Sequence, residues 1–267
     1  MNMRSRSGRR PGVGTASALA PPAALAALLT AALVLLAACA PLQPSPSQPA
    51  PTSPVARPEA GVVPPSFPLD FYRGIARRGE AVLAVDPTRS LVVVEVRRDG
   101  SLAKLGHDHV IAAHDLRGFV APDERRADLY VRLDTLTVDE PQLRAKAGFD
   151  TEPTAADIAG TRRNMLGRVL HADAHPYALV AVTRSAEGRD LDVAITLNGI
   201  TRHVAVQAAL DQDAGGYDAT GAFAIEQTDF GIRPFSIMGG ALAVANRLDI
   251  RFAVHARRIA QFPAAGR

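Results

Sequence analysis

The chain has 267 residues, of which 47% are hydrophobic and 21% charged, with one cysteine and no tryptophan. A single cysteine excludes a disulfide framework, so the fold must depend on a hydrophobic core. Residues 1–38 hold four of the 30 basic residues and none of the 27 acidic ones, so their removal changes the net charge from +3 to −1. The remainder has no positive excess that would indicate a nucleic-acid-binding protein.

The first 38 residues have the pattern of a secretion signal. Four arginines precede an uncharged stretch rich in Ala and Leu that runs from Ser17 to Cys39. This stretch ends in Leu36-Ala37-Ala38-Cys39, which resembles the lipobox of bacterial lipoproteins, where the cysteine carries a diacylglycerol. We therefore expect a lipoprotein signal at 1–38 and a lipid anchor at Cys39. The alternative is an uncleaved membrane anchor, since the apolar stretch approaches the minimum length of a span.

A proline-rich segment follows the cysteine. Seven of the nineteen residues 40–58 are proline, which favours an extended tether over a packed element. Ala40, rather than Asp, comes directly after Cys39, which resembles the enterobacterial pattern for sorting to the outer membrane. We expect a tether over 39–79 that holds a periplasmic domain (80–259) to the bacterial membrane. Residues 260–267 are expected to form a C-terminal tail.

Alternation of apolar and polar residues between residues 80 and 259 predicts half-buried strands. The alternation is clearest in four stretches, 90–98, 127–138, 189–210 and 246–258. In the third, Asn198-Gly199 predicts a type I′ turn, in which both residues need positive φ. The stretch 189–210 is therefore expected to be a β-hairpin.

Helical patterning is confined to the middle of this domain. Pro153-Thr154 is a start signal for a helix that Pro176 would close, and residues 140–149 favour a second, shorter helix. We expect an all-β fold with a helical insertion. An antiparallel meander of about eight strands usually closes into a barrel, because closure removes exposed edges.

The order of several motifs resembles the YceI-like family. The motifs are AVLAVDPTRSLVVVEVRR (81–98), NMLGRVLHADAHPYALVAV (164–182), ITLNGITRHVAVQAAL (195–210), FAIEQTDFGI (223–232) and ALAVANRLDIRFAVHA (241–256). The resemblance implies an eight-stranded, lipocalin-like antiparallel β-barrel with a long apolar cavity, in which characterised relatives bind polyisoprenoids or other amphiphiles. Three features depart from the family pattern. The chain has a predicted lipid anchor, whereas many relatives are soluble; Gln227 replaces a frequent basic residue; and residues 102–120 have an unusual sequence rich in histidine.

The apolar strand positions admit two interpretations, a packed core and a lipid cavity. The strands are built mainly from Ala, Val and Leu, and such small residues favour a cavity in a barrel of this size. The expected lining residues are Leu129, Val131, Leu133, Phe223, Ile225, Leu248, Ile250 and Phe252.

Three of the seven histidines lie within residues 104–115. His107 and His109 would share one face of a regular strand, where they would contact a polar head group. Alternatively, they are half of a metal site, which would need a third ligand from elsewhere. His171 and His175 are four residues apart, which suits a shared metal only within a helix, and otherwise fits a helix end.

The chain lacks the motifs of common enzyme classes. It has no nucleophile elbow, phosphate loop or dinucleotide fingerprint, and the DFG at 229–231 lacks every other kinase motif. We therefore expect a binding protein without a catalytic residue or a resident cofactor, whose partners are an isoprenoid or quinone-like lipid and the membrane. The alternatives are a metal-dependent enzyme or metal-binding protein that uses His107 and His109, and an envelope protein without a ligand. A homodimer is left open.

Overall fold

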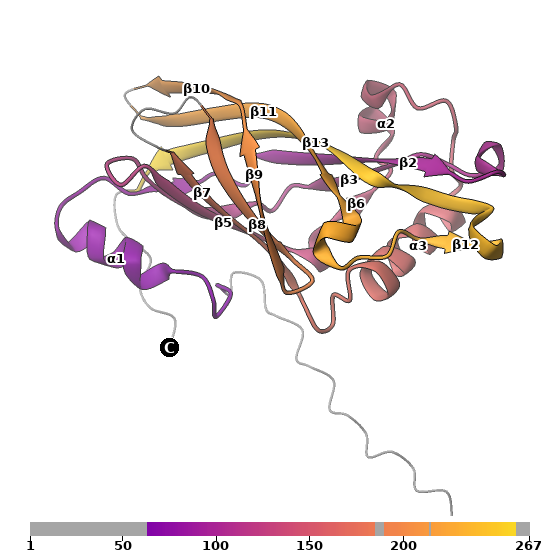
Figure 1. Cartoon of the computed structure of the whole chain (residues 1–267). Helices are drawn as coiled ribbons and strands as arrows, with labels where there is room; N and C mark the ends of the chain where they lie inside the picture. The colour runs from indigo at the N-terminus through magenta and orange to yellow at the C-terminus, as the bar shows by residue number, and fades with distance from the viewer. Residues whose placement is uncertain (1–62, 185–189, 214, 260–267) are drawn as a thin grey trace, which may run out of the picture. The chain divides into compact units, whose positions relative to one another are not determined.

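Antiparallel β-sheet makes up most of the fold (Figure 1). The computed structural model describes residues 63–184, 190–213 and 215–259. The predicted signal, Cys39, the tether as far as residue 62 and the C-terminal tail lie outside these residues. No helix of the described residues combines the length and the apolar character needed to span a bilayer.

The described elements comprise thirteen strands and three α-helices. The strands are β1 (Leu83–Val85), β2 (Leu91–Asp99), β3 (His109–Ala113), β4 (Arg117–Ala121), β5 (Arg126–Arg132), β6 (Thr137–Val138), β7 (Tyr177–Arg184), β8 (Leu191–Leu197), β9 (Ile200–Val206), β10 (Ala208–Asp213), β11 (Gly216–Glu226), β12 (Ser236–Ile237) and β13 (Leu242–Arg258). The helices are α1 (Leu69–Arg77), α2 (Pro141–Ala147) and α3 (Ala155–Asn164).

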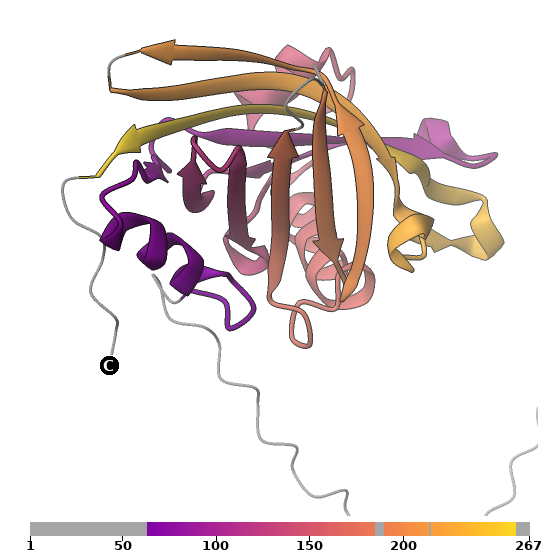
Figure 2. The same ribbon diagram turned by 60° about the vertical axis from the view of Figure 1, so that its left-hand side comes forward.

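The long strand β13 organises the sheet. It pairs with β11 along one edge, and with β2 and then β1 along the other. From β2 the ladder continues to β3 and β6, and from β1 it continues through β4, β5, β7 and β8 to β9. The strongly curved sheet wraps around an interior, with α3 at its lower side and α1 outside β4 and β5 (Figures 1 and 2).

The structure corrects the prediction of a closed barrel of eight strands. The ladders join thirteen strands and do not close, because β9 pairs only with β8 while β10 pairs only with β11. The chain passes from β9 to β10 at Gln207, where it changes partners. Partner changes of this kind divide continuous alternating stretches into separate short strands, which raises the count above the expected eight.

The structure confirms the predicted β-turn at Asn198-Gly199 and the predicted helix start at Thr154. Asn198 and Gly199 have φ values of 50° and 73°, and they join β8 to β9 as predicted. Thr154 caps α3, where its hydroxyl accepts a hydrogen bond from the backbone N–H of Asp157 and its own N–H donates to the Asp157 carboxylate. The helix continues only as a π-helix over Met165–Val169, so it ends well before Pro176.

The tether boundary predicted at residue 79 lies too late. Residues 69–77 form α1, and Tyr72 and Ile75, three positions apart, are fully buried against the outer face of β4 and β5. The Tyr72 hydroxyl donates a 2.6 Å hydrogen bond to buried Asp128. The high proline content of residues 40–58 does not extend into this segment, which packs as part of the domain.

Candidate ligand-binding site

The interior of the curved sheet holds two adjoining apolar cavities. The first has a volume of about 300 Å³, and its walls come from β2, β3, β5, β7, β8, β11 and β13. The end of α3 contributes Thr161 and Asn164, and the π-helical segment with its last flanking residue contributes Met165, Val169 and Leu170. Only His109, Thr161, Asn164 and Gln227 introduce polar side chains into its wall.

The second cavity has a volume of about 560 Å³ and shares part of its wall with the first. The shared residues are Val92, Leu116, Val180, Ile195, Phe223 and Ile250. Its polar lining consists of Arg125, Arg126, Arg184, Gln212 and Tyr217. The two cavities together form an elongated apolar interior with different polar groups in each part.

His109 is held in place by a buried carboxylate. Its Nδ1 donates a 2.6 Å hydrogen bond to Asp139, whose side chain is completely buried. Asp139 also accepts hydrogen bonds from the Val110 backbone N–H (2.9 Å) and from the guanidinium of Arg144 (2.7 Å). Since Nδ1 is engaged in this way, Nε2 is the ring nitrogen left for a partner in the first cavity.

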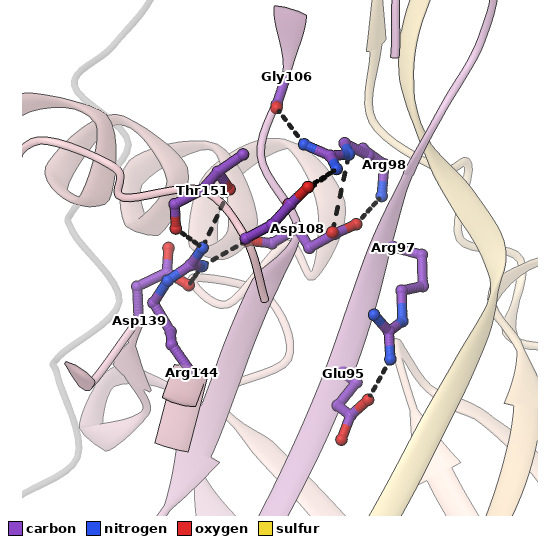
Figure 3. Close-up of polar contacts among 9 residues, drawn as sticks. Glu95, Arg97, Arg98, Gly106, Asp108, Asp139, Arg144 and Thr151 are labelled. Atoms are coloured by element: carbon purple, nitrogen blue, oxygen red, sulfur yellow. Dashed lines mark hydrogen bonds and ion pairs between the residues drawn. The ribbon is translucent and has the colours of Figure 1, made fainter. Parts of the chain in front are cut away.

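Arg144 links this carboxylate to the loop that follows α2 (Figure 3). Its guanidinium donates to the backbone carbonyls of Asp108 and Thr151 as well as to Asp139. Arg144 is itself buried, so both charges of the pair are removed from water. Burial alone raises the pKa of Asp139, but the hydrogen bonds from His109, Val110 and Arg144 outweigh it and hold the pKa below its usual value.

Asp108 has a structural role beside this network (Figure 3). The side chain is buried and accepts a 2.8 Å hydrogen bond from the backbone N–H of Arg98. The Arg98 guanidinium in turn donates to the Gly106 carbonyl and pairs with Asp150. The central residue of the His-Asp-His sequence thus fixes the chain before β3.

The model of the YceI-like domain matches residues 84–256, more than half of the chain. The chain belongs to this family. Among solved structures, this YceI-like chain is similar to a polyisoprenoid-binding domain from Saccharophagus degradans (12% identity, TM-score 0.49, covering 67% of this chain and 100% of the other). It is also similar to BcnA from Burkholderia cenocepacia (16% identity, TM-score 0.44, covering 64% of this chain and 98% of the other). A third similar structure is the Campylobacter jejuni YceI protein (10% identity, TM-score 0.37, covering 57% of this chain and 85% of the other). No curated protein sequence matches significantly.

Most of the predicted lining residues of this YceI-like domain face the interior. Seven of the ten predicted contact residues line the first cavity, namely His109, Val131, Leu133, Phe223, Ile225, Leu248 and Ile250. Leu129 and Phe252 line the second. Val94 and Ile195 belong to the same walls and could have been found from the alternation in 90–98 and 189–210. The helical residues Thr161 and Asn164 had no such signal.

His107 lines neither cavity. Strand β3 begins only at His109, and His107 precedes it, with Nε2 3.9 Å from Asp157 at the start of α3. The two imidazole rings are 6.3 Å apart. A shared face requires a regular strand through both histidines, and this condition is not met, because the buried Asp108 holds the preceding residues outside the ladder.

The metal-site alternative lacks a third ligand in the part of the chain that the structure describes. There, no group of three His, Cys, Asp or Glu side chains is arranged to hold a metal ion. His171 and His175 follow the end of the π-helix, so they do not share a helical face. His114, His203 and His255 each pair with one carboxylate, of Glu140, Asp192 and Asp218 respectively.

Gln227 fills an irregularity in the sheet. The ladder between β13 and β2 is interrupted between Val244 and Leu248. Buried Gln227 donates a 2.8 Å hydrogen bond to the Ala245 carbonyl within this interruption. The departure from the family's frequent basic residue thus places a neutral donor, rather than a charge, in the cavity wall.

Proposed function

We propose that this YceI-like domain binds an amphiphilic lipid with a long apolar chain, of isoprenoid or quinone type, in the two adjoining cavities. The supporting observation is the elongated interior itself, whose walls are almost entirely apolar. Each methylene moved from water into such an interior contributes about 0.8 kcal/mol, so a chain of many carbons would be held without charged contacts. The family membership supports lipid binding.

The polar end of the ligand is proposed to meet His109. This side chain and the polar groups of Thr161, Asn164 and Gln227 all belong to the wall of the first cavity. A ring fixed by Asp139 presents Nε2 in one orientation, which suits a hydrogen bond to a head group with few polar atoms. A quinone or an alcohol has such a head group.

Lipid bound to the purified full chain is the first expected result. Native mass spectrometry after gentle extraction should show a population heavier than the polypeptide by the mass of one lipid. Acidic extraction and chromatography should then release a compound with a long hydrocarbon chain. A chain that stays empty after exposure to a mixture of isoprenoids, quinones and fatty acids contradicts the proposal.

We further propose that the protein is a lipoprotein on the periplasmic side of a bacterial membrane, in the outer membrane. The sequence of residues 1–39 carries this proposal. Radiolabelled palmitate supplied to expressing cells should label the protein, and Cys39→Ser should abolish the label while Ser17→Ala leaves it in place. Equal labelling of the Cys39→Ser and parent chains contradicts the proposed anchor.

A further inference from the structure

Two neighbouring loops carry most of the exposed apolar side chains of the described residues. Leu105 is 73% exposed, Met238 70% and Ile237 41%, and the only other large exposed hydrophobic residue there is Leu210, at 42%. Leu105 ends a short 3-10 turn after β2, whereas Ile237 is the last residue of β12 and Met238 follows it before β13. We call Leu105, Ile237 and Met238 the tip surface.

The two loops form one end of the molecule. The Leu102 N–H donates a 2.7 Å hydrogen bond to the Ala241 carbonyl, and Asp99 of β2 pairs with Ala243 of β13. A Cβ atom added to Gly100 would lie 2.5 Å from that same carbonyl oxygen, so the backbones are in close contact. Both views show the two loops extending together beyond the sheet (Figures 1 and 2).

The turn that exposes Met238 has an unfavourable backbone conformation. Met238 has a φ of 52°, and Gly239 and Gly240 follow with 67° and 91°. A non-glycine residue is uncommon in this region, and strain of this kind persists most often where a side chain has an interaction to make. Large apolar side chains held outward on a strained turn indicate a contact surface.

Three basic side chains without a carboxylate partner among the described residues belong to segments next to the tip surface. Lys104 precedes Leu105, Arg233 comes four residues before Ile237, and Arg168 of the π-helix stacks over the Phe235 ring at 5.1 Å. All three are exposed, and within the described residues none forms an ion pair. Of the nearby acidic residues, Asp150 is engaged by Arg98, while exposed Asp99 accepts a hydrogen bond from the Gly100 N–H and leaves basic residues in excess. An anionic surface would therefore complement this end of the molecule.

The same loops lead into the first cavity. Val96 near the end of β2, Phe235 just before β12 and Val244 at the start of β13 all line it. The exposed apolar tip and the apolar interior are therefore separated by only a few residues along each strand. A lipid leaving a bilayer at the tip would find the cavity wall beside it.

We propose that the tip surface docks on an anionic lipid bilayer. Leu105, Ile237 and Met238 enter the acyl-chain region, while Lys104, Arg168 and Arg233 contact the lipid phosphates. This contact is separate from the N-terminal anchor and presents the first cavity to the membrane. Only its use in lipid exchange rests on the proposed function; the docking itself does not.

Tryptophan fluorescence tests the docking locally, since the chain has no tryptophan of its own. Full-length Met238→Trp is mixed with vesicles of phosphatidylcholine and phosphatidylglycerol (3:1) whose acyl chains are brominated. The emission should shift to shorter wavelength and be quenched at least threefold. Thr183→Trp is the matched control and should show little quenching, because Thr183 is exposed and lines neither cavity, and both proteins share the same N-terminal segment.

A second tryptophan variant at the tip surface tests whether the result depends on misfolding of the first. Leu105→Trp should behave like Met238→Trp, and circular dichroism should match the parent for each variant. Equal quenching at the tip and at position 183 overturns the proposal. So does a blue shift that grows with protein concentration without vesicles, which would identify a second copy of the chain as the occupant.

Substitution of Lys104 and Arg233 by glutamine tests the contribution of the charges near the tip surface. Lys104→Gln and Arg233→Gln, each made in the Met238→Trp chain, should weaken vesicle affinity about fivefold, as expected for one basic residue near an anionic surface. Neutral vesicles should remove this difference. Lipid occupancy by native mass spectrometry should stay at the parent level in these variants, so failure of docking is distinguishable from failure of lipid binding. Unchanged affinity in both glutamine variants contradicts the role of the charges.

Discussion

Val180→Trp is expected to reduce the amount of bound lipid at least tenfold while the domain remains folded. Val180 lies on β7 and lines both cavities, so a large ring there would occupy the space that they share. Overfilling a tightly packed core costs about 1–3 kcal/mol, whereas an unfilled cavity can accept the ring with little loss. Native mass spectrometry measures the amount of bound lipid, and urea denaturation of the same sample measures the free energy of unfolding.

The matched control is Thr183→Trp on the same strand. Thr183 is exposed and lines neither cavity, so its replacement should leave both lipid content and stability near those of the parent. A Val180→Trp protein that keeps its lipid would contradict binding in the shared interior. A loss of about 3 kcal/mol in the free energy of unfolding would show instead that the site is packed.

Asp139→Asn is expected to lower the free energy of unfolding by about 3–5 kcal/mol. The substitution leaves the buried Arg144 guanidinium without its countercharge, and an uncompensated buried charge carries a cost of this size. It also removes the acceptor that orients His109. Chemical denaturation monitored by circular dichroism gives the value.

Asp150→Asn is the corresponding control, because Asp150 pairs with Arg98 at a position where its side chain is 71% exposed. An exposed ion pair stabilises a fold by at most about 1 kcal/mol, so the free energy of unfolding of this variant should lie within about 1 kcal/mol of the parent value. If the free energy of unfolding of Asp139→Asn also lies within about 1 kcal/mol of the parent value, the buried network does not stabilise the fold as inferred.

The same pair predicts how stability depends on pH. The native state holds the pKa of Asp139 below its usual value, so its stabilisation is fully present above the unfolded pKa of about 3.9. Stability should therefore fall as the pH drops from that value through the lower native pKa. The Asp139→Asn protein should lose less stability over this interval than the parent does.

Local chemistry made part of this fold predictable. The Asn198-Gly199 turn follows from the need for positive φ at two successive residues, and the Thr154 cap follows from a side chain that satisfies free backbone N–H groups. The cavity walls also follow from alternation, since a strand directs every second side chain to one face. These signals act within a few residues and need no knowledge of the partner strand.

The parts that escaped prediction depend on distant partners. Asp139 lies 30 residues from His109 in sequence, and nothing local to either residue shows that a buried carboxylate will orient that ring. The division of the meander into thirteen strands depends on where each strand changes neighbour. Helix α1 was missed because its burial depends on Asp128 and the outer face of β4 and β5.

The place of β13 in the sheet has a consequence for how the chain folds. Among the described residues, the β6-β3-β2 half and the β1-β4-β5-β7-β8-β9 half are joined in the ladder only through β13, which comes after all the other described strands in the sequence. Pairing between segments so far apart in sequence is slow to form. The two halves therefore stay unjoined until the C-terminal strand is available, which keeps the chain open during any export that precedes folding.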